Sequence, residues 1–346
     1  MDPVYLVILV GSIILVAVLS YFDNVIKKRK RERYLLEAQP KIDKAIAEID
    51  TDRLIEYLQF EETYEIAGNA LKEIGQPAVE PLFTVLQDPL FSPVRGNGKP
   101  IWIIIQDPNL VSLVHAQAKY CSLVRAQVTF ILGEIGGHRA VEALIYVLRN
   151  PRTRAKAPAQ FASDEEAVCR IVAAGALGEI GDSDAIESLF ETAIQDPDSN
   201  VRVIAACALF KLGDPHALDA LVESLQPNLM DLAWPYRAVG VSVLGAIGDS
   251  KVIPLLIDHL AYWRDDVQRA ATEALAGMGE PAFEALMALA NSEEKLRIYA
   301  FYALGKMGNL RALPELERLA REDKNRAIRR AAKIAAEAIQ QNQKAT

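Results

Sequence analysis

The stretch LGEIG occurs twice in this chain, at Leu132–Gly136 and again, 45 positions later, at Leu177–Gly181. Looser copies, each closing on a glycine, lie before and after these two. They are LKEIG at Leu71–Gly75, LFKLG at Leu209–Gly213, LGAIG at Leu244–Gly248, LAGMG at Leu275–Gly279 and LGKMG at Leu304–Gly308. The later copies recur about every 31 residues, and a repeat of roughly 20–50 residues indicates a solenoid or a similar array.

Each repeat has the pattern of two helices. Asn200–Gly213 carries apolar residues at helical spacing, and Gly213 ends that helix because glycine accepts the left-handed conformation. Asp214 and Pro215 then begin the next helix, as its cap and its first residue. One such pair cannot bury its apolar side alone, whereas stacked pairs can. The pattern therefore predicts an all-α fold, an α-solenoid of about eight antiparallel helix pairs.

An arginine stands seven residues before the leucine of most copies. The series is Arg125, Arg170, Arg202, Arg237 and Arg297, with Arg329 in a degenerate last copy. Gln268 interrupts the series, and acidic residues often lie a few positions earlier. This pattern, D-x-x-V-R followed by A-x-x-A-L-x-x-I-G, resembles the HEAT-repeat superfamily. More narrowly, it is similar to the bacterial and archaeal HEAT-like repeats of the phycobilisome lyase type, over roughly residues 50–340.

The resemblance implies a structural role for the arginines, which would pair with the acid of the preceding turn and with neighbouring carbonyl groups. It implies little about function, because related proteins include scaffolds, transport factors, lyase subunits and hydroxylases. Those hydroxylases hold two irons with paired His-Glu motifs, and none of the four histidines here is followed by Glu. No P-loop, nucleophile elbow or zinc-protease motif occurs either. We therefore expect no enzyme activity, no cofactor and no metal site.

The N-terminal stretch Val4–Phe22 contains no charged residue. Nineteen helical residues would span about 29 Å, roughly the thickness of the bilayer hydrocarbon. A basic flank follows, made of Lys27, Lys28, Arg29, Lys30, Arg31 and Arg33. Because the charge follows the apolar run and no A-x-A site is present, the pattern predicts a retained anchor rather than a signal peptide. The positive-inside rule then predicts a single-pass protein of a cell membrane with a cytoplasmic C-terminal domain.

The predicted organisation has four parts. They are a transmembrane anchor over residues 1–23, a basic juxtamembrane segment and stalk helix over 24–50, the solenoid over 51–340, and a tail over 341–346. Two intervals between pentapeptides exceed the period, and their extra residues fall between the first and second helices of their repeats. These inserts cover about 88–115 and 150–165. Insertions at the same point of adjacent repeats emerge on one edge of a solenoid, so we expect the two inserts to lie side by side.

The tryptophans fall at the same point of the repeat. Trp102 lies in the first insert, and Trp234 and Trp263 lie in the corresponding connections of later repeats. Tryptophan and arginine are favoured anchors of protein interfaces. The candidate partner-binding residues on this edge are Trp102, Ile104, Arg152, Arg154, Trp234 and Trp263. The alternative is that these side chains cap the ends of the core and fix the inserts to it.

The net charge of −8 disfavours general nucleic-acid binding, which depends on neutralising phosphates. Arg318–Lys333 is a basic segment in this acidic chain, with seven basic residues against Glu322 and Asp323. It fits the solvated face of a capping helix, or a second contact with an anionic surface. The sequence as a whole predicts a membrane-anchored scaffold or adaptor that holds protein partners. The alternative is a subunit or chaperone-like accessory of an enzyme complex of the phycobilin-lyase kind.

Overall fold

The computed structural model describes residues 29, 32–58, 60, 63–87, 124–149, 165–226, 232–292 and 296–345. These residues form helices and turns, with no strand among them. The prediction of an all-α fold is confirmed for this part of the chain. Contacts divide the chain into two compact units, one of residues 1–99 and 122–131 and the other of residues 100–121 and 132–346.

In the first unit, a helix over residues 32–47 precedes two helix pairs. The elements that follow are α2 (Thr51–Tyr57), α3 (Tyr64–Ile74), η1 (Gln76–Ala78), α4 (Val79–Gln87) and, in part, α6 (Val124–Ile135). The Asp50 side chain caps α2 by accepting a hydrogen bond from the backbone N–H of Arg53. Arg125 of α6 is buried and donates a hydrogen bond to the carbonyl of Leu86 in α4. This contact joins the two helices of one pair.

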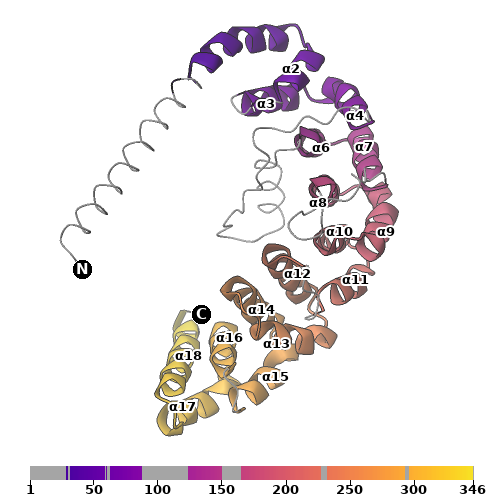
Figure 1. The fold of residues 1–346 in the computed structure, drawn as a ribbon. Helices are drawn as coiled ribbons and strands as arrows, with labels where there is room; N and C mark the ends of the chain where they lie inside the picture. The colour runs from indigo at the N-terminus through magenta and orange to yellow at the C-terminus, as the bar shows by residue number, and fades with distance from the viewer. Residues whose placement is uncertain are drawn as a thin grey trace, which may run out of the picture. The chain divides into compact units, whose positions relative to one another are not determined.

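The second unit continues the alternation of first and second helices. Its elements are α7 (His138–Arg149), α8 (Glu165–Ile180), η2 (Ser183–Ala185), α9 (Ile186–Gln195), α10 (Ser199–Lys211), α11 (Ala217–Ser224), α12 (Trp234–Ile247), η3 (Ser250–Val252), α13 (Ile253–Leu260), α14 (Asp265–Met278), α15 (Glu280–Ala290), α16 (Arg297–Met307), η4 (Leu310–Ala312), α17 (Leu313–Glu322) and α18 (Arg326–Ala345). Within this unit the second helices α8, α10, α12, α14, α16 and α18 pack one against the next (Figure 1). From α2/α3 to α17/α18, the described helices make eight consecutive pairs, as the repeat predicts.

The recurring pentapeptide forms the end of the second helix, and its first and last residues have separate roles. The leucine is fully buried in all seven copies, at Leu71, Leu132, Leu177, Leu209, Leu244, Leu275 and Leu304. The closing glycine has a positive φ in all seven, at Gly75, Gly136, Gly181, Gly213, Gly248, Gly279 and Gly308. In the five copies that end at Gly75, Gly136, Gly181, Gly248 and Gly308, the glycine N–H donates to the carbonyl of that leucine, which closes the last turn of the helix. A side chain would strain this left-handed conformation, so glycine is required there.

The glycine at the second position of the pentapeptide sets the distance between neighbouring second helices. A Cβ atom added to Gly245 would lie 2.4 Å from the Cβ of Ala274 in the next second helix. A Cβ added to Gly133 would lie 2.6 Å from the Cβ of Ala176. The same close approach joins Gly178 to Ala208 and Gly305 to Ala335. At these four places, successive second helices therefore touch almost backbone to backbone.

The predicted membrane location needs correction. Across the part of the chain that the structure describes, no helix is long and apolar enough to cross a bilayer. The longest of these helices, α18, carries five basic residues and one acidic residue. Placing these charges in the hydrocarbon of a bilayer would cost a large free energy. The predicted span Val4–Phe22 lies outside the described residues, as do Lys27, Lys28, Lys30 and Arg31 of its flank, while Arg29 and Arg33 are exposed. The prediction of a single-pass membrane location is contradicted, because none of the described helices can serve as the span.

Candidate functional site

The arginine series joins one repeat to the next. Arg170 of α8 forms a bidentate pair with Asp196, the residue that follows α9, with N–O distances of 2.7 and 3.1 Å. Both side chains are buried, at 2% and 6% exposure. The backbone carbonyl of the same Asp196 accepts a hydrogen bond of 2.8 Å from Arg202 of α10. One aspartate therefore links the arginines of two successive repeats.

The last repeats use the same arrangement. Arg297 of α16 pairs with Asp323 at 2.7 Å, and the carbonyl of Asp323 accepts a hydrogen bond of 2.7 Å from Arg329 of α18. The backbone N–H of Asn325 and the Arg297 guanidinium lower the pKa of the Asp323 carboxyl. Arg170–Asp196 and Arg297–Asp323 both span 26 positions, so the link recurs with the repeat.

A variant of this link occurs where the arginine series is interrupted. Tyr262 stands six residues before Gln268, as Asp196 stands before Arg202. The guanidinium of Arg237 lies 5.0 Å from the centre of the Tyr262 ring, so a cation–π contact replaces the ion pair. The Gln268 amide donates a 2.6 Å hydrogen bond to the Tyr262 carbonyl, as Arg202 does to Asp196. Gln268 thus takes the place of an arginine in the series.

His259 completes this buried group and predicts a pH-dependent stability. Its Nδ1 lies 2.7 Å from the Leu255 carbonyl, so Nδ1 carries the proton and Nε2, 3.3 Å from an Arg237 nitrogen, accepts. Burial lowers the pKa of His259, and the nearby Arg237 lowers it further. The unfolded chain therefore binds more protons than the folded one below about pH 6.5, and stability falls as the pH falls through that value.

We expect the free energy of unfolding to fall as the pH is lowered from 7.5 to 5, because this histidine is protonated more readily in the unfolded chain than in the folded one. Urea unfolding of the wild type and of His259→Gln, which keeps an acceptor for Arg237, measures the difference. The variant should lose that part of the pH dependence. Identical pH dependence in both proteins would show that His259 is not held neutral.

The two described tryptophans of the predicted edge converge on one arginine. Trp234 is the first residue of α12, and Trp263 lies in the turn between α13 and α14. The guanidinium of Arg264 lies 4.4 Å from the Trp234 ring centre and 5.4 Å from the Trp263 ring centre. Asp266 accepts a 3.1 Å hydrogen bond from the same guanidinium and holds it in place. We call Trp234, Trp263 and Arg264 the tryptophan stack.

Trp263 is 72% exposed, while Trp234 is half-buried. Trp263 therefore does not cap the core, whereas Trp234 is in part covered by it. The other predicted members of the edge, Trp102, Ile104, Arg152 and Arg154, lie outside the described residues. Arg264 was not predicted, although its position next to Trp263 and its charge could have indicated it.

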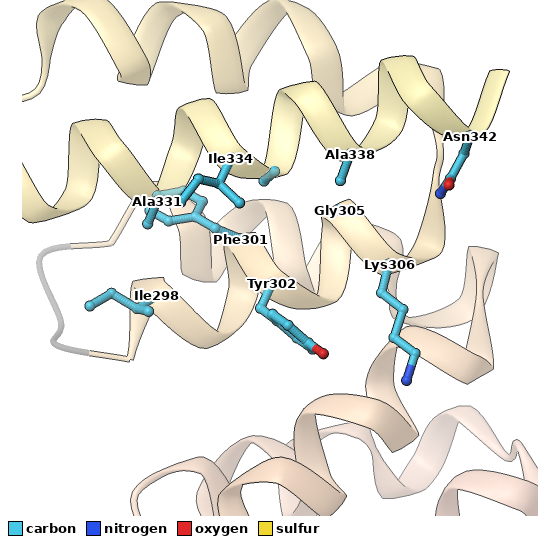
Figure 2. Close-up of a pocket in the computed structure, with 10 residues that line it drawn as sticks. Ile298, Phe301, Tyr302, Gly305, Lys306, Ala331, Ile334, Ala338 and Asn342 are labelled. Carbon is cyan, nitrogen blue, oxygen red and sulfur yellow. The ribbon is translucent and has the colours of Figure 1, made fainter. Parts of the chain in front are cut away.

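A second surface, absent from the sequence-based predictions, lies between α16 and α18. It is an open apolar groove of about 620 Å³, lined on one side by Ile298, Tyr302 and Lys306 and on the other by Ile334 and Ala338 (Figure 2). Exposed apolar residues form its walls: Ile298 is 46%, Tyr302 58% and Ile334 56% exposed. We call this surface the α16/α18 groove.

A third group joins two successive repeats at the ends of their first helices. Among the described residues, His138, Asp182 and Asp184 bring one ligand atom each within 4.8 Å of one another. The His138 Nδ1 lies 3.7 Å from Asp184, and the Asp182 side chain accepts a hydrogen bond from the Asp184 backbone N–H. His138 and Asp184 are exposed. The cap formed by Asp182 and the nearby contact of His138 with Asp184 explain this group, so we assign no metal to it.

Comparison with known proteins identifies the repeats. HEAT repeats match residues 155–233 and 263–337, and the PBS lyase HEAT-like repeat matches residues 124–150. No curated protein matches the chain. A solved complex of CpcE and CpcF of phycocyanin lyase from Nostoc sp. PCC7120 is 26% identical, covers 72% of this chain and 93% of its own, and has a TM-score of 0.36. Human deoxyhypusine hydroxylase in complex with glycerol is 19% identical, covers 87% and 99%, and has a TM-score of 0.33. The predicted HEAT-like repeats are confirmed, while TM-scores below 0.5 leave both structures without bearing on function.

Proposed function

We propose that this chain is a protein-binding scaffold or adaptor, which holds partner proteins on its HEAT-like repeats and catalyses no reaction itself. The observation that supports this most is the tryptophan stack. Tryptophan and arginine dominate the energetic centres of protein interfaces. Arg264 is already ordered between two rings and by Asp266, so binding there loses little side-chain entropy.

Three potentially reactive side chains of the described residues, His259, Cys207 and Cys169, are buried in the core, which supports binding over catalysis. Burial and the nearby Arg237 lower the pKa of His259 and keep it neutral, and its two ring nitrogens already contact the Leu255 carbonyl and Arg237. Burial raises the pKa of the Cys207 thiol to about 12, so it is not a nucleophile near neutral pH. Cys169 is likewise free and buried.

Trp263→Ala should weaken the binding of a partner by on the order of 30-fold, the loss typical of a hot-spot residue. Tagged full-length protein would be crosslinked in its source cells, and captured proteins quantified for the wild type and the variant. Ile194→Ala, an exposed apolar residue of α9, is the matched control. Proteins captured by the wild type and by the control, and lost with Trp263→Ala, are partners whose dissociation constants can then be measured. A captured set that Trp263→Ala leaves unchanged contradicts the proposal.

One observation favours a second role, that of an accessory subunit in a bilin-attaching enzyme complex. It is the match of residues 124–150 to the PBS lyase HEAT-like repeat. This role predicts that purified chain shifts the absorption spectrum of a free phycobilin when the two are mixed. A spectrum that stays unchanged excludes direct bilin binding and leaves the scaffold role.

A further inference from the structure

The walls of the α16/α18 groove have the spacing of a seat for a third helix. Ile298, Tyr302 and Lys306 follow one another every four residues along α16, so they share one face of that helix. Ile334, Ala338 and Asn342 do the same along α18. Ile298 lies at one end of the groove, and Lys306 and Asn342 lie at the other (Figure 2). A third, amphipathic helix has apolar residues every three to four positions along one face. Such a helix could place that face between these two rows.

The floor of the groove combines the ring of Phe301 with the small residues Gly305, Ala331, Ala335 and Ala338 (Figure 2). A Cβ added to Gly305 would lie 3.1 Å from the Cα of Ala335, so α16 and α18 touch at this point. Ala331 and Ala338 extend the small surface along α18. Phe301 is only 1% exposed and does not rise into the groove, so a helix could bring its apolar side chains down between Tyr302 and Ile334. The groove runs along about three helical turns of α18, or roughly 16 Å.

The charge of these two helices is opposite to that of the chain as a whole. The chain has a net charge of −8. Together α16 and α18 carry seven basic residues, Arg297, Lys306, Arg326, Arg329, Arg330, Lys333 and Lys344, against the single acid Glu337. Arg330 is exposed and stands one turn before Ile334, so a cation lies near each end of the groove.

Lys306 already has a partner, which limits how much it contributes. Its Nζ lies 3.6 Å from a carboxylate oxygen of Glu273 in α14, and the two side chains are 51% and 41% exposed. Such an exposed pair is weak, so a carboxylate of a bound helix can compete for the lysine. Arg330, near the other end of the groove, also favours a bound helix that carries carboxylates.

We propose, building on the scaffold function, that the α16/α18 groove binds an acidic amphipathic helix of a partner protein. The apolar face of that helix packs on Ile298, Tyr302 and Ile334, and its carboxylates face Arg330 and Lys306. A second copy of this chain is the poorer occupant. A two-fold contact through the groove would set the same basic helices against each other.

The test uses a defined probe and the full-length protein. A fluorescent 18-residue helical peptide of Leu, Ala and Glu, with leucines on one face, is titrated with the protein and its anisotropy followed. A matched peptide has every Glu replaced by Lys. We expect the acidic peptide to bind at least tenfold tighter than the basic one, and its affinity to fall as salt is raised.

Two groove variants and one control locate the binding. Ile334→Glu should weaken the acidic peptide at least tenfold, and Arg330→Glu combined with Lys306→Glu should reverse the preference toward the basic peptide. Leu310→Glu, which places the same charge on a residue 50% exposed in η4, should change neither affinity. Each of these positions is exposed, and unchanged unfolding midpoints would show that the fold is intact.

Equal affinity for the two peptides, or an acidic peptide that binds Ile334→Glu as well as the wild type, overturns the inference. The inference is also overturned if the protein binds neither peptide but binds anionic phospholipid vesicles, or dimerises, in a way that depends on Ile334. The result is separable from the proposed function. If the peptide fails to bind while Trp263→Ala still loses partners, only the groove assignment falls.

Discussion

Asp196→Ala is expected to lower the free energy of unfolding by about 3–5 kcal/mol, because it leaves the buried Arg170 guanidinium without its carboxylate. The ion pair is bidentate and nearly inaccessible to water. Asp196 also accepts a hydrogen bond of 2.9 Å from the backbone N–H of Asp198, which the substitution removes as well. Urea unfolding followed by circular dichroism measures the loss.

The control for this prediction is an ion pair at the surface of the same pair of repeats. Arg149 lies 3.5 Å from Glu187, and these side chains are 47% and 82% exposed. Glu187→Ala should therefore cost less than about 1 kcal/mol. If Asp196→Ala cost no more than Glu187→Ala, the buried arginines would not be what links the repeats.

Gly245→Ala should destabilise the protein by about 3 kcal/mol through overpacking. The added methyl group would lie 2.4 Å from the Ala274 Cβ and 2.6 Å from the Ala274 Cα. The obstacle includes backbone, so α12 and α14 must separate to make room. Hydrogen exchange should show the loss of protection concentrated in these two helices.

Gly277→Ala provides a matched control in the neighbouring second helix, α14. Gly277 lies inside α14, its φ is not positive, and an added Cβ would meet nothing within 4 Å. Alanine is the better helix former, so this variant should be more stable than the wild type by about 0.5–1 kcal/mol. Opposite signs for the two glycines are the expected result, and destabilisation of equal size by both would refute the close-packing role of Gly245.

Much of the fold follows from the sequence, because each signal acts within one helix or one turn. The closing glycine of LGEIG predicts a left-handed helix end, and Gly181 has that conformation. The role of its neighbour Gly178 was not predictable in this way. It depends on Ala208, 30 positions away in the chain, which touches it only when the repeats have stacked. In the sequence, Gln268 only interrupts the arginine series. The structure shows that its amide donates to the Tyr262 carbonyl and so makes the hydrogen bond that an arginine makes elsewhere in the series.

The candidate sites follow from the sequence only in part, for a similar reason. The repeat register places Trp234 and Trp263 at equivalent points of two repeats, but only the structure shows Arg264 between them. The groove was missed because Ile298 and Ile334 look like ordinary members of apolar helices. Their exposure becomes apparent once Phe301 and Ala332 are seen to fill the core side of those helices.

Photocrosslinking from position 263 tests the central claim, that the tryptophan stack contacts a partner protein, most directly. A photoreactive phenylalanine analogue replaces Trp263 in the full-length chain, and irradiation in the source cells traps whatever lies against it. The same analogue at Ile194, an exposed position of α9, is the control. We predict a discrete crosslinked protein from position 263 that is absent from position 194. Identical patterns from the two positions, or no protein crosslink from either, would contradict the account.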